Sequence, residues 1–314
     1  MFKKVRFSLL IVVFLFAISA NGAPMGYSIN SDSDDVSNED SLYEIDLATG
    51  TESKLGKLVW GLETRSDTEG LALDSDGNLW GIDDESRTLF QIDTGDGSID
   101  FQNEIFFPGF PAGGSNDFGM TFGCDNSLYA TSVTTQTLYR LSWEDQNGIN
   151  TIIGSAGSLG ANISAIAAIG NPTRLYGLSN GDSPSLYSID TDTGVATWLF
   201  ALGGGVGEYD EAGLAFDSES ELWAITDRRL IDSGLPSQIL SINIETKTTT
   251  VVSTTLELGF ESLAISQPVE CDPVVDNANV DKDPRIPTLN PTGRLLAVIV
   301  LMLTGMAVLR RRII

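Results

Sequence analysis

Leu42-Tyr43-Glu44-Ile45-Asp46 is a short apolar-polar segment that returns four more times along the chain. The other copies are Leu89-Phe90-Gln91-Ile92-Asp93, Leu138-Tyr139-Arg140-Leu141, Leu186-Tyr187-Ser188-Ile189-Asp190 and Ile239-Leu240-Ser241-Ile242-Asn243. They begin at residues 42, 89, 138, 186 and 239, so successive copies lie 47 to 53 residues apart. A repeat of this length built from short strands is typical of a β-propeller blade. The pattern therefore predicts an all-β fold.

Each repeat can be divided into four strands, of which the quoted segment is the third. The first strand is small and apolar, as in Gly70-Leu71-Ala72-Leu73, and the second carries an aromatic residue, as in Leu79-Trp80-Gly81-Ile82. The fourth is polar and β-branched, as in Thr248-Thr249-Thr250-Val251-Val252, which suits an outer edge. Small residues on the first strand fit the crowded centre of a propeller.

The two ends of the repeat region complete one blade between them. Ser262-Leu263-Ala264-Ile265 is a first strand with nothing after it, and residues 27–29, 42–46 and 53–58 are three strands with no first strand before them. We therefore predict a five-bladed β-propeller over residues 24–266, closed by pairing of the N- and C-terminal strands.

Alternating strand direction sorts the connections by face. Tight turns lie on one face, and the long connections lie on the other: residues 30–40, 60–69, 83–87, 106–117, 203–211 and 226–236. Asp74, Asp76, Asn78 and Glu85 match positions 1, 3, 5 and 12 of a calcium loop, but Leu79 stands where that loop needs glycine. We interpret residues 74–78 as a turn, and the long-loop face as the place for binding.

Four acidic residues, Glu69, Asp117, Glu211 and Glu261, stand just before the inner strands. Side chains in that position converge at the mouth of the central channel, where carboxylates repel one another unless a cation lies between them. Oxygen ligands of this kind suit Ca²⁺. The alternative is four solvated loop acids in an acidic chain.

Five aromatic residues also fall on the long-loop side: Trp60, Phe106, Phe107, Phe110 and Tyr209. Two roles are open for them. They contact a ligand on this face, or they pack the long loops onto the ring.

The stretch Asp67-Thr68-Glu69-Gly70-Leu71-Ala72-Leu73-Asp74 resembles the start of an inner strand in calcium-dependent six-bladed propellers, such as gluconolactonase-like and esterase-like phytase proteins. The resemblance covers one blade. It implies that Glu69 ligates a channel metal, and it gives a hydrolase as a candidate activity.

The N-terminal segment, residues 1–23, has the pattern of a secretory signal peptide. Lys3, Lys4 and Arg6 precede a largely apolar run, and small residues follow it. A retained membrane anchor is the alternative interpretation, although the run is short for a membrane span.

The C-terminal segment, residues 286–314, contains a short motif, an apolar run and a basic cluster. These are Ile286-Pro287-Thr288-Leu289, then Leu295 to Leu309, then Arg310, Arg311 and Arg312. This order resembles the IPTL-CTERM protein-sorting domain of Gram-negative bacteria. It implies a transmembrane helix, a sorting enzyme in the inner membrane as a partner, and a propeller held outside the cytoplasm or released to the outer surface after sorting. An ordinary single-pass membrane anchor is the alternative and would give the same location. Residues 267–285, between the propeller and this segment, are predicted to be a linker.

Composition excludes several functions. The formal net charge is −25 over 314 residues, which disfavours nucleic acid and anionic lipid as partners. There is no histidine, so Ser-His-Asp and Cys-His catalysis are excluded, and the commonest zinc ligand is missing. Cys124 and Cys271 suit an oxidising compartment, either as one disulfide or as free thiols.

These observations predict a binding protein of the cell envelope. Its long-loop face would contact a polysaccharide, a matrix component or another exported protein. The alternative is a Ca²⁺-dependent hydrolase of lactones or phosphoesters, in which the metal polarises the substrate and activates water. Glu69 and Glu211 would then be ligands, and Asp117 or Glu261 a ligand or base.

Overall fold

The computed structural model describes residues 23–31, 37–60, 63–65, 67–111, 116–143, 148–181, 183–229, 231–232 and 234–271, with the backbone alone at residues 60, 63 and 101. The sorting motif, the apolar C-terminal run, the arginine cluster and all of the predicted signal peptide except Ala23 lie outside these residues. Within them, no helix is long and apolar enough to cross a membrane.

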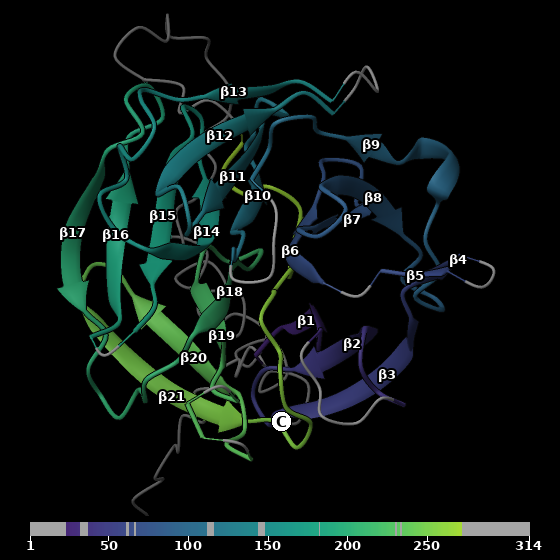
Figure 1. The fold of residues 1–314 in the computed structure, drawn as a ribbon. Coiled ribbons are helices and arrows are strands. Elements are labelled where there is room, and N and C mark those ends of the chain that lie inside the picture. Colours follow the sequence, from purple (N-terminus) through teal and green to yellow (C-terminus); the bar gives the residue numbers. More distant parts are fainter. Residues whose placement is uncertain are drawn as a thin grey trace, which may run out of the picture. The chain divides into compact units, whose positions relative to one another are not determined.

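Five antiparallel sheets of three or four strands surround a centre, one sheet for each predicted blade (Figure 1). Blade 1 contains β1 (Met25–Ile29), β2 (Ser41–Asp46) and β3 (Thr51–Lys57). Blade 2 contains β6 (Thr68–Leu73), β7 (Leu79–Asp83), β8 (Thr88–Ile92) and β9 (Ile105–Phe106). Blade 3 contains β10 (Met120–Phe122), β11 (Leu128–Ser132), β12 (Thr137–Leu141) and β13 (Asn150–Ile152). Blade 4 contains β14 (Ile163–Ile169), β15 (Arg174–Ser179), β16 (Ser185–Ile189) and β17 (Ala196–Ala201), and blade 5 contains β18 (Glu211–Phe216), β19 (Leu222–Asp227), β20 (Gln238–Asn243) and β21 (Thr248–Thr254).

The repeated segment forms the third strand of every blade, as predicted. In each copy the first residue is completely buried; these residues are Leu42, Leu89, Leu138, Leu186 and Ile239. The fourth strands are the outer edges, and most residues of β3, β17 and β21 are half-buried or exposed. The repeat is therefore the apolar layer that lets each blade pack against its neighbours.

Three short elements lie outside the four-strand pattern. β4 (Val59–Trp60) and β5 (Glu63–Thr64) form a small hairpin within the predicted long connection after blade 1. A single 3₁₀ turn, η1 (Phe101–Asn103), precedes β9.

The inner strands are crowded, which explains their small residues. A Cβ atom on Gly119 would lie 2.7 Å from the backbone nitrogen of Ile166 in the next blade. On Gly213 it would lie 2.2 Å from the backbone nitrogen of Leu263. Side chains at these positions would force neighbouring blades apart, because such approaches lie well inside van der Waals contact.

Blade 1 is closed by the C-terminal end of the ring, but more briefly than the sequence predicts. Tyr27 and Ala264 exchange two backbone hydrogen bonds of 2.7 and 2.9 Å, and this bridge stands alone rather than in a strand. Beyond it, one longer backbone hydrogen bond, from the Glu261 N–H to the Ile29 carbonyl (3.4 Å), is joined by side-chain hydrogen bonds. The Ser28 hydroxyl donates to the Ser262 carbonyl (2.5 Å), and the Ile29 N–H donates to the Ser262 hydroxyl (3.2 Å). The predicted closure is thus confirmed, through a short ladder in which the side chains of Ser28 and Ser262 take part.

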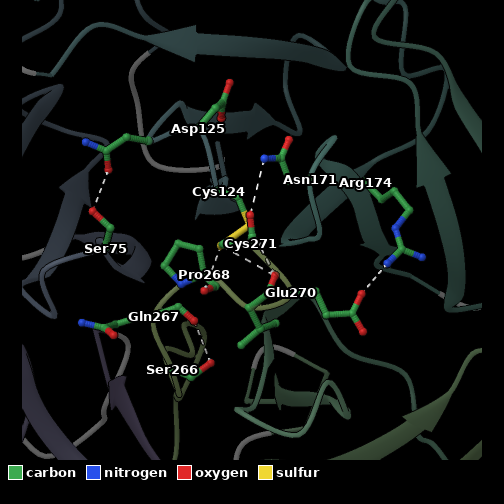
Figure 2. The surroundings of a disulfide bond; sticks show 12 residues. Ser75, Cys124, Asp125, Asn171, Arg174, Ser266, Gln267, Pro268, Glu270 and Cys271 are labelled. Carbon is green, nitrogen blue, oxygen red and sulfur yellow. Dashed lines mark hydrogen bonds and ion pairs between the residues drawn. A yellow bond between two sulfur atoms is a disulfide. The ribbon is translucent and has the colours of Figure 1, made fainter. Parts of the chain in front are cut away.

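The chain then contacts the tight turns of blades 3 and 4, and Figure 2 shows the residues around this contact. Cys124 and Cys271 form a disulfide, which settles the choice left open above. The Gly170 N–H donates to the Val269 carbonyl (3.0 Å), and Arg174 pairs with Glu270 (2.8 Å). Residues 267–271, assigned to the linker from sequence, therefore pack against the ring; we call residues 266–271 the strap.

Candidate metal centre at the channel mouth

Acidic residues from three blades meet at one end of the channel, as the sequence predicts. Glu69 belongs to β6, Glu211 begins β18, and Asp117 lies three residues before β10. One carboxylate oxygen from each of the three lies within 4.8 Å of the other two. Glu261, the fourth predicted acid, is also buried, but within the described residues it is not a member of this group. We call Glu69, Asp117 and Glu211 the mouth site.

Burial makes this arrangement of charges unfavourable without a counter-ion. It raises the pKa of Glu69 well above its usual value, and the carboxylates of Glu211 and Asp117 raise that pKa further. Burial also raises the pKa of Asp117 to about 6, although a hydrogen bond with Glu211 works in the opposite direction. Carboxylates this close need a shared proton or a cation between them.

The spacing suits a hard divalent cation. Ca²⁺ binds oxygen ligands at about 2.3–2.6 Å, so two of its ligands lie at most about 5 Å apart. The 4.8 Å limit on the mouth site satisfies that condition. The arrangement can therefore bind Ca²⁺ through all three carboxylates without a large movement of the backbone.

Blade 4 contributes an amide in place of an acid. Asn180, directly after β15, donates through Nδ2 to the Asp210 carbonyl (2.5 Å) and to Asp117 Oδ2 (3.4 Å). It thereby orients one member of the mouth site. Nothing in its sequence context distinguishes Asn180 from other loop amides, so sequence analysis missed it.

Two further acids beside Glu69 were also missed, Asp67 and Asp84. Their carboxylate oxygens form a second group with Glu69, again within 4.8 Å of one another. The sequence carries no signal for this pair. The regular β6–β7 register, in which Leu73 pairs with Leu79, would place Asp84 opposite Thr68. A bulge between Thr68 and Gly70 instead pairs Thr68 with Asp83, and this brings Asp67 beside Asp84.

Of the five predicted aromatic residues, three are buried and take the packing role. Phe107 and Tyr209 are completely buried, and the Tyr209 hydroxyl donates to the Ser179 carbonyl (2.9 Å). Phe110 is 2% exposed and packs edge-on against the ring of Tyr139, with ring centroids 4.9 Å apart. These three side chains hold the long loops on the ring and present little surface to a ligand.

The other two aromatic residues stay open as ligand contacts. Phe106 is 46% exposed, with the Arg87 guanidinium 5.1 Å from its ring centroid. The backbone of Trp60 lies in β4.

The turn at residues 74–78 is a structural feature, as predicted. Asp74 accepts hydrogen bonds of 2.9 Å from the backbone N–H groups of Asp76 and Asn78, the Asn78 amide and the indole N–H of Trp80. These bonds counter the effect of burial and lower the pKa of Asp74. Its carboxylate is therefore occupied by the protein itself.

The space beneath the mouth site is very small. The cavity that Glu69 lines between the inner strands has a volume of about 10 Å³, which is room for about one water molecule. A second cavity, of about 30 Å³, lies further along the inner strands and is lined by Gln267, Pro268 and Val269 of the strap. Sites for small organic ligands are typically 300–1,000 Å³, so neither of these two cavities can enclose such a ligand.

Comparison with known proteins finds only distant similarity of structure. No protein family and no curated protein matches the sequence. Virginiamycin B lyase from Staphylococcus aureus is similar in structure, at 18% identity and a TM-score of 0.39, over 68% of this chain and 62% of the lyase. The chain thus spans less than two thirds of the lyase.

Two other solved structures are similar over nearly their whole length. One is a chain of a nidogen–laminin complex, at 11% identity and a TM-score of 0.47, covering 78% of this chain and 98% of that one. The other is a protein of unknown function from Bacteroides caccae, at 10% identity and a TM-score of 0.43, covering 78% and 100%. Likeness at this level says nothing about activity.

Proposed function

We propose that this protein is a binding propeller of the cell envelope that holds Ca²⁺ in its mouth site and uses the ion to bind a polysaccharide on the long-loop face. The observation that supports this most is the convergence of Glu69, Asp117 and Glu211 from three blades. A cation binds most favourably between buried carboxylates with raised pKa values, because it removes their mutual repulsion.

The ion would supply what the protein surface lacks. A chain with a net charge of −25 repels acidic polymers, and a bound Ca²⁺ provides a local positive charge for them. Ca²⁺ takes six to eight oxygen ligands, so three carboxylates that give one oxygen each leave about three to five positions. Hydroxyl and carboxylate oxygens of a sugar polymer can fill those positions.

The experiment is a calcium-dependent binding assay with the purified protein. Immobilised uronate-containing and neutral polysaccharides are compared in calcium and in EDTA. We expect retention by the uronate polymer in calcium, with loss in EDTA and in Glu69→Gln. Glu245→Gln, an exposed acid in the β20–β21 turn, is the matched control and should bind like the wild type. Equal binding in calcium and EDTA would contradict the proposal.

A Ca²⁺-dependent hydrolase of lactones or phosphoesters is the second candidate. It is favoured by the place of Asp117 in the mouth site, where this buried carboxylate could act as the general base for a metal-bound water. The 10 Å³ cavity does not separate the two candidates, because in both the ligand would reach the ion from the long-loop face. Turnover of a lactone and phosphoester panel in calcium, abolished in Asp117→Asn, would establish the hydrolase; no turnover leaves the binding protein.

We also propose that the chain is exported, anchored by its C-terminal helix and processed at residues 286–289 by a sorting enzyme. The disulfide between Cys124 and Cys271 supports an oxidising compartment. Mass spectrometry of the mature protein tests this directly. We expect an N-terminus between residues 21 and 24, and an intact N-terminus at Met1 would contradict export through a cleaved signal peptide.

A further inference from the structure

Asp67, Glu69 and Asp84 form a second carboxylate group beside the mouth site, and the two groups share Glu69. Each of the three contributes an oxygen that lies within 4.8 Å of the other two. The backbone fixes this arrangement, since the Asp84 N–H donates to the Asp67 carbonyl (3.1 Å). The group thus joins the start of β6 to the β7–β8 turn.

Asp84 is the member that points to a ligand. It is completely buried, and neither of its carboxylate oxygens receives a hydrogen bond from a donor in the described part of the chain. A buried carboxylate without donors is strongly unfavourable, because the loss of hydration is not repaid. Its polar neighbour is another carboxyl, that of Asp67. Two buried carboxyl groups lie side by side, with no other donor, only when they share a proton or a cation.

The neighbouring Asp83 shows that turn geometry does not explain Asp84. Oδ1 of Asp83 accepts hydrogen bonds from the N–H and hydroxyl groups of Ser86 (2.7 and 2.5 Å), and Oδ2 accepts from the Asp67 N–H (3.3 Å). Asp83 therefore closes the turn with both of its oxygens. Asp84 has no comparable structural task.

We propose that Asp67, Glu69 and Asp84 hold a second divalent cation, Ca²⁺, and that Glu69 bridges the two ions. The ligands are all carboxylate oxygens, which are the donors that Ca²⁺ prefers, and their spacing fits its coordination distance. This ion neutralises Asp84, clamps the β7–β8 turn to the start of β6, and thereby orients Glu69 toward the mouth site. The inference extends the proposed function, but it depends on Asp67 and Asp84 rather than on Asp117 and Glu211.

The test counts bound calcium. The purified full chain is stripped with EDTA, dialysed to equilibrium against saturating calcium at neutral pH, and its calcium is measured by atomic emission. We expect two ions per wild-type chain, one in Asp84→Asn and one in Asp117→Asn. Glu85→Gln is the matched control, because Glu85 is exposed and stands next to Asp84, and this variant should retain two ions.

The outcomes separate this inference from the proposed function. One ion in the wild type that persists in Asp84→Asn but is lost in Asp117→Asn overturns the second site and retains the first. One ion that is lost in Asp84→Asn and persists in Asp117→Asn retains the second site and overturns the mouth site. No bound calcium overturns both, and Asp67 and Asp84 then share a proton.

Melting in EDTA guards against a variant that merely fails to fold. Asp84→Asn has nearly the same shape as the wild type and removes a buried charge, so in EDTA it should melt at or above the wild-type temperature while it gains less from calcium. If Asp84→Asn is unfolded, Asp67→Asn gives the same count at a half-buried position. Two ions retained in Asp67→Asn would likewise contradict the second site.

Discussion

Removing the disulfide should destabilise the propeller severely, although the bond lies outside the five sheets. Cys124 and Cys271 are 147 residues apart in sequence, so their bond closes more than half of the ring into one loop. In the chain-entropy description, a loop of this length restricts the unfolded chain by about 17 cal/mol/K, or about 5 kcal/mol at 25 °C. The native contacts of the strap that remain are weak, since its ion pair between Arg174 and Glu270 is half exposed and contributes at most about 1 kcal/mol.

The assay is urea unfolding of the wild type and of the double variant Cys124→Ala/Cys271→Ala. We expect a loss of about 5 kcal/mol, or about 10–20 °C in the melting temperature of a domain of this size. Reduction of the wild type should give the same loss, and the double variant should not respond to the reductant. A double variant within about 1 kcal/mol of the wild type would refute the reasoning, because the strap would then be held by packing alone.

Three further predictions concern the ring. Asp217→Ala removes the acceptor of the buried Trp223 indole N–H (2.9 Å) and two turn hydrogen bonds. Chemical denaturation should therefore show a free energy of unfolding lower by about 2–4 kcal/mol, and a change below about 0.5 kcal/mol would contradict this role. Gly213→Ala places a Cβ 2.2 Å from the Leu263 nitrogen, so the closing segment should open, seen as faster amide exchange at residues 262–265; unchanged exchange would be inconsistent with the tight approach. Burial raises the pKa of Asp40 from 3.8 to about 7, so the folded state retains a proton that the unfolded state has lost, and stability should fall as the pH rises from about 4 to 7. That slope should be shallower in Asp40→Asn, and an identical slope in the variant would show that Asp40 does not hold the proton.

The fold could be predicted from the sequence because its information is local and repeated. Each third strand carries its own alternation, and five copies at a steady spacing leave little choice of architecture. The closure followed from counting strands at the two ends, and the bridge between Tyr27 and Ala264 confirms it. The shortening of that ladder could not be foreseen, because it depends on the hydroxyl positions of Ser28 and Ser262.

The site was predicted only in part, because the repeat defines where each strand begins but not where the side chains of the loops point. The convergence of Glu69, Asp117 and Glu211 follows from strand direction, which the repeat defines. The different roles of Asp83 and Asp84 do not follow from strand direction. Two adjacent acids in a turn look equivalent in sequence, and only the positions of their side chains distinguish them.

The orientation of the aromatic side chains could not be predicted from the sequence either. Phe107, Phe110 and Tyr209 lie in loops without a regular alternation of apolar residues, so the sequence alone does not say whether their side chains turn inward. All three are buried.

The most direct test of the account is the melting temperature of the wild-type chain as free calcium is raised from EDTA conditions to millimolar levels at neutral pH. Binding to the folded state alone stabilises it by about 2.7 kcal/mol at a hundred times the dissociation constant. For a domain of this size that corresponds to a rise of about 5–10 °C. The carboxylates gathered around Glu69 predict this rise, and its loss in Glu69→Gln. A melting temperature that does not change across the titration would contradict the claim that the channel mouth is a calcium site.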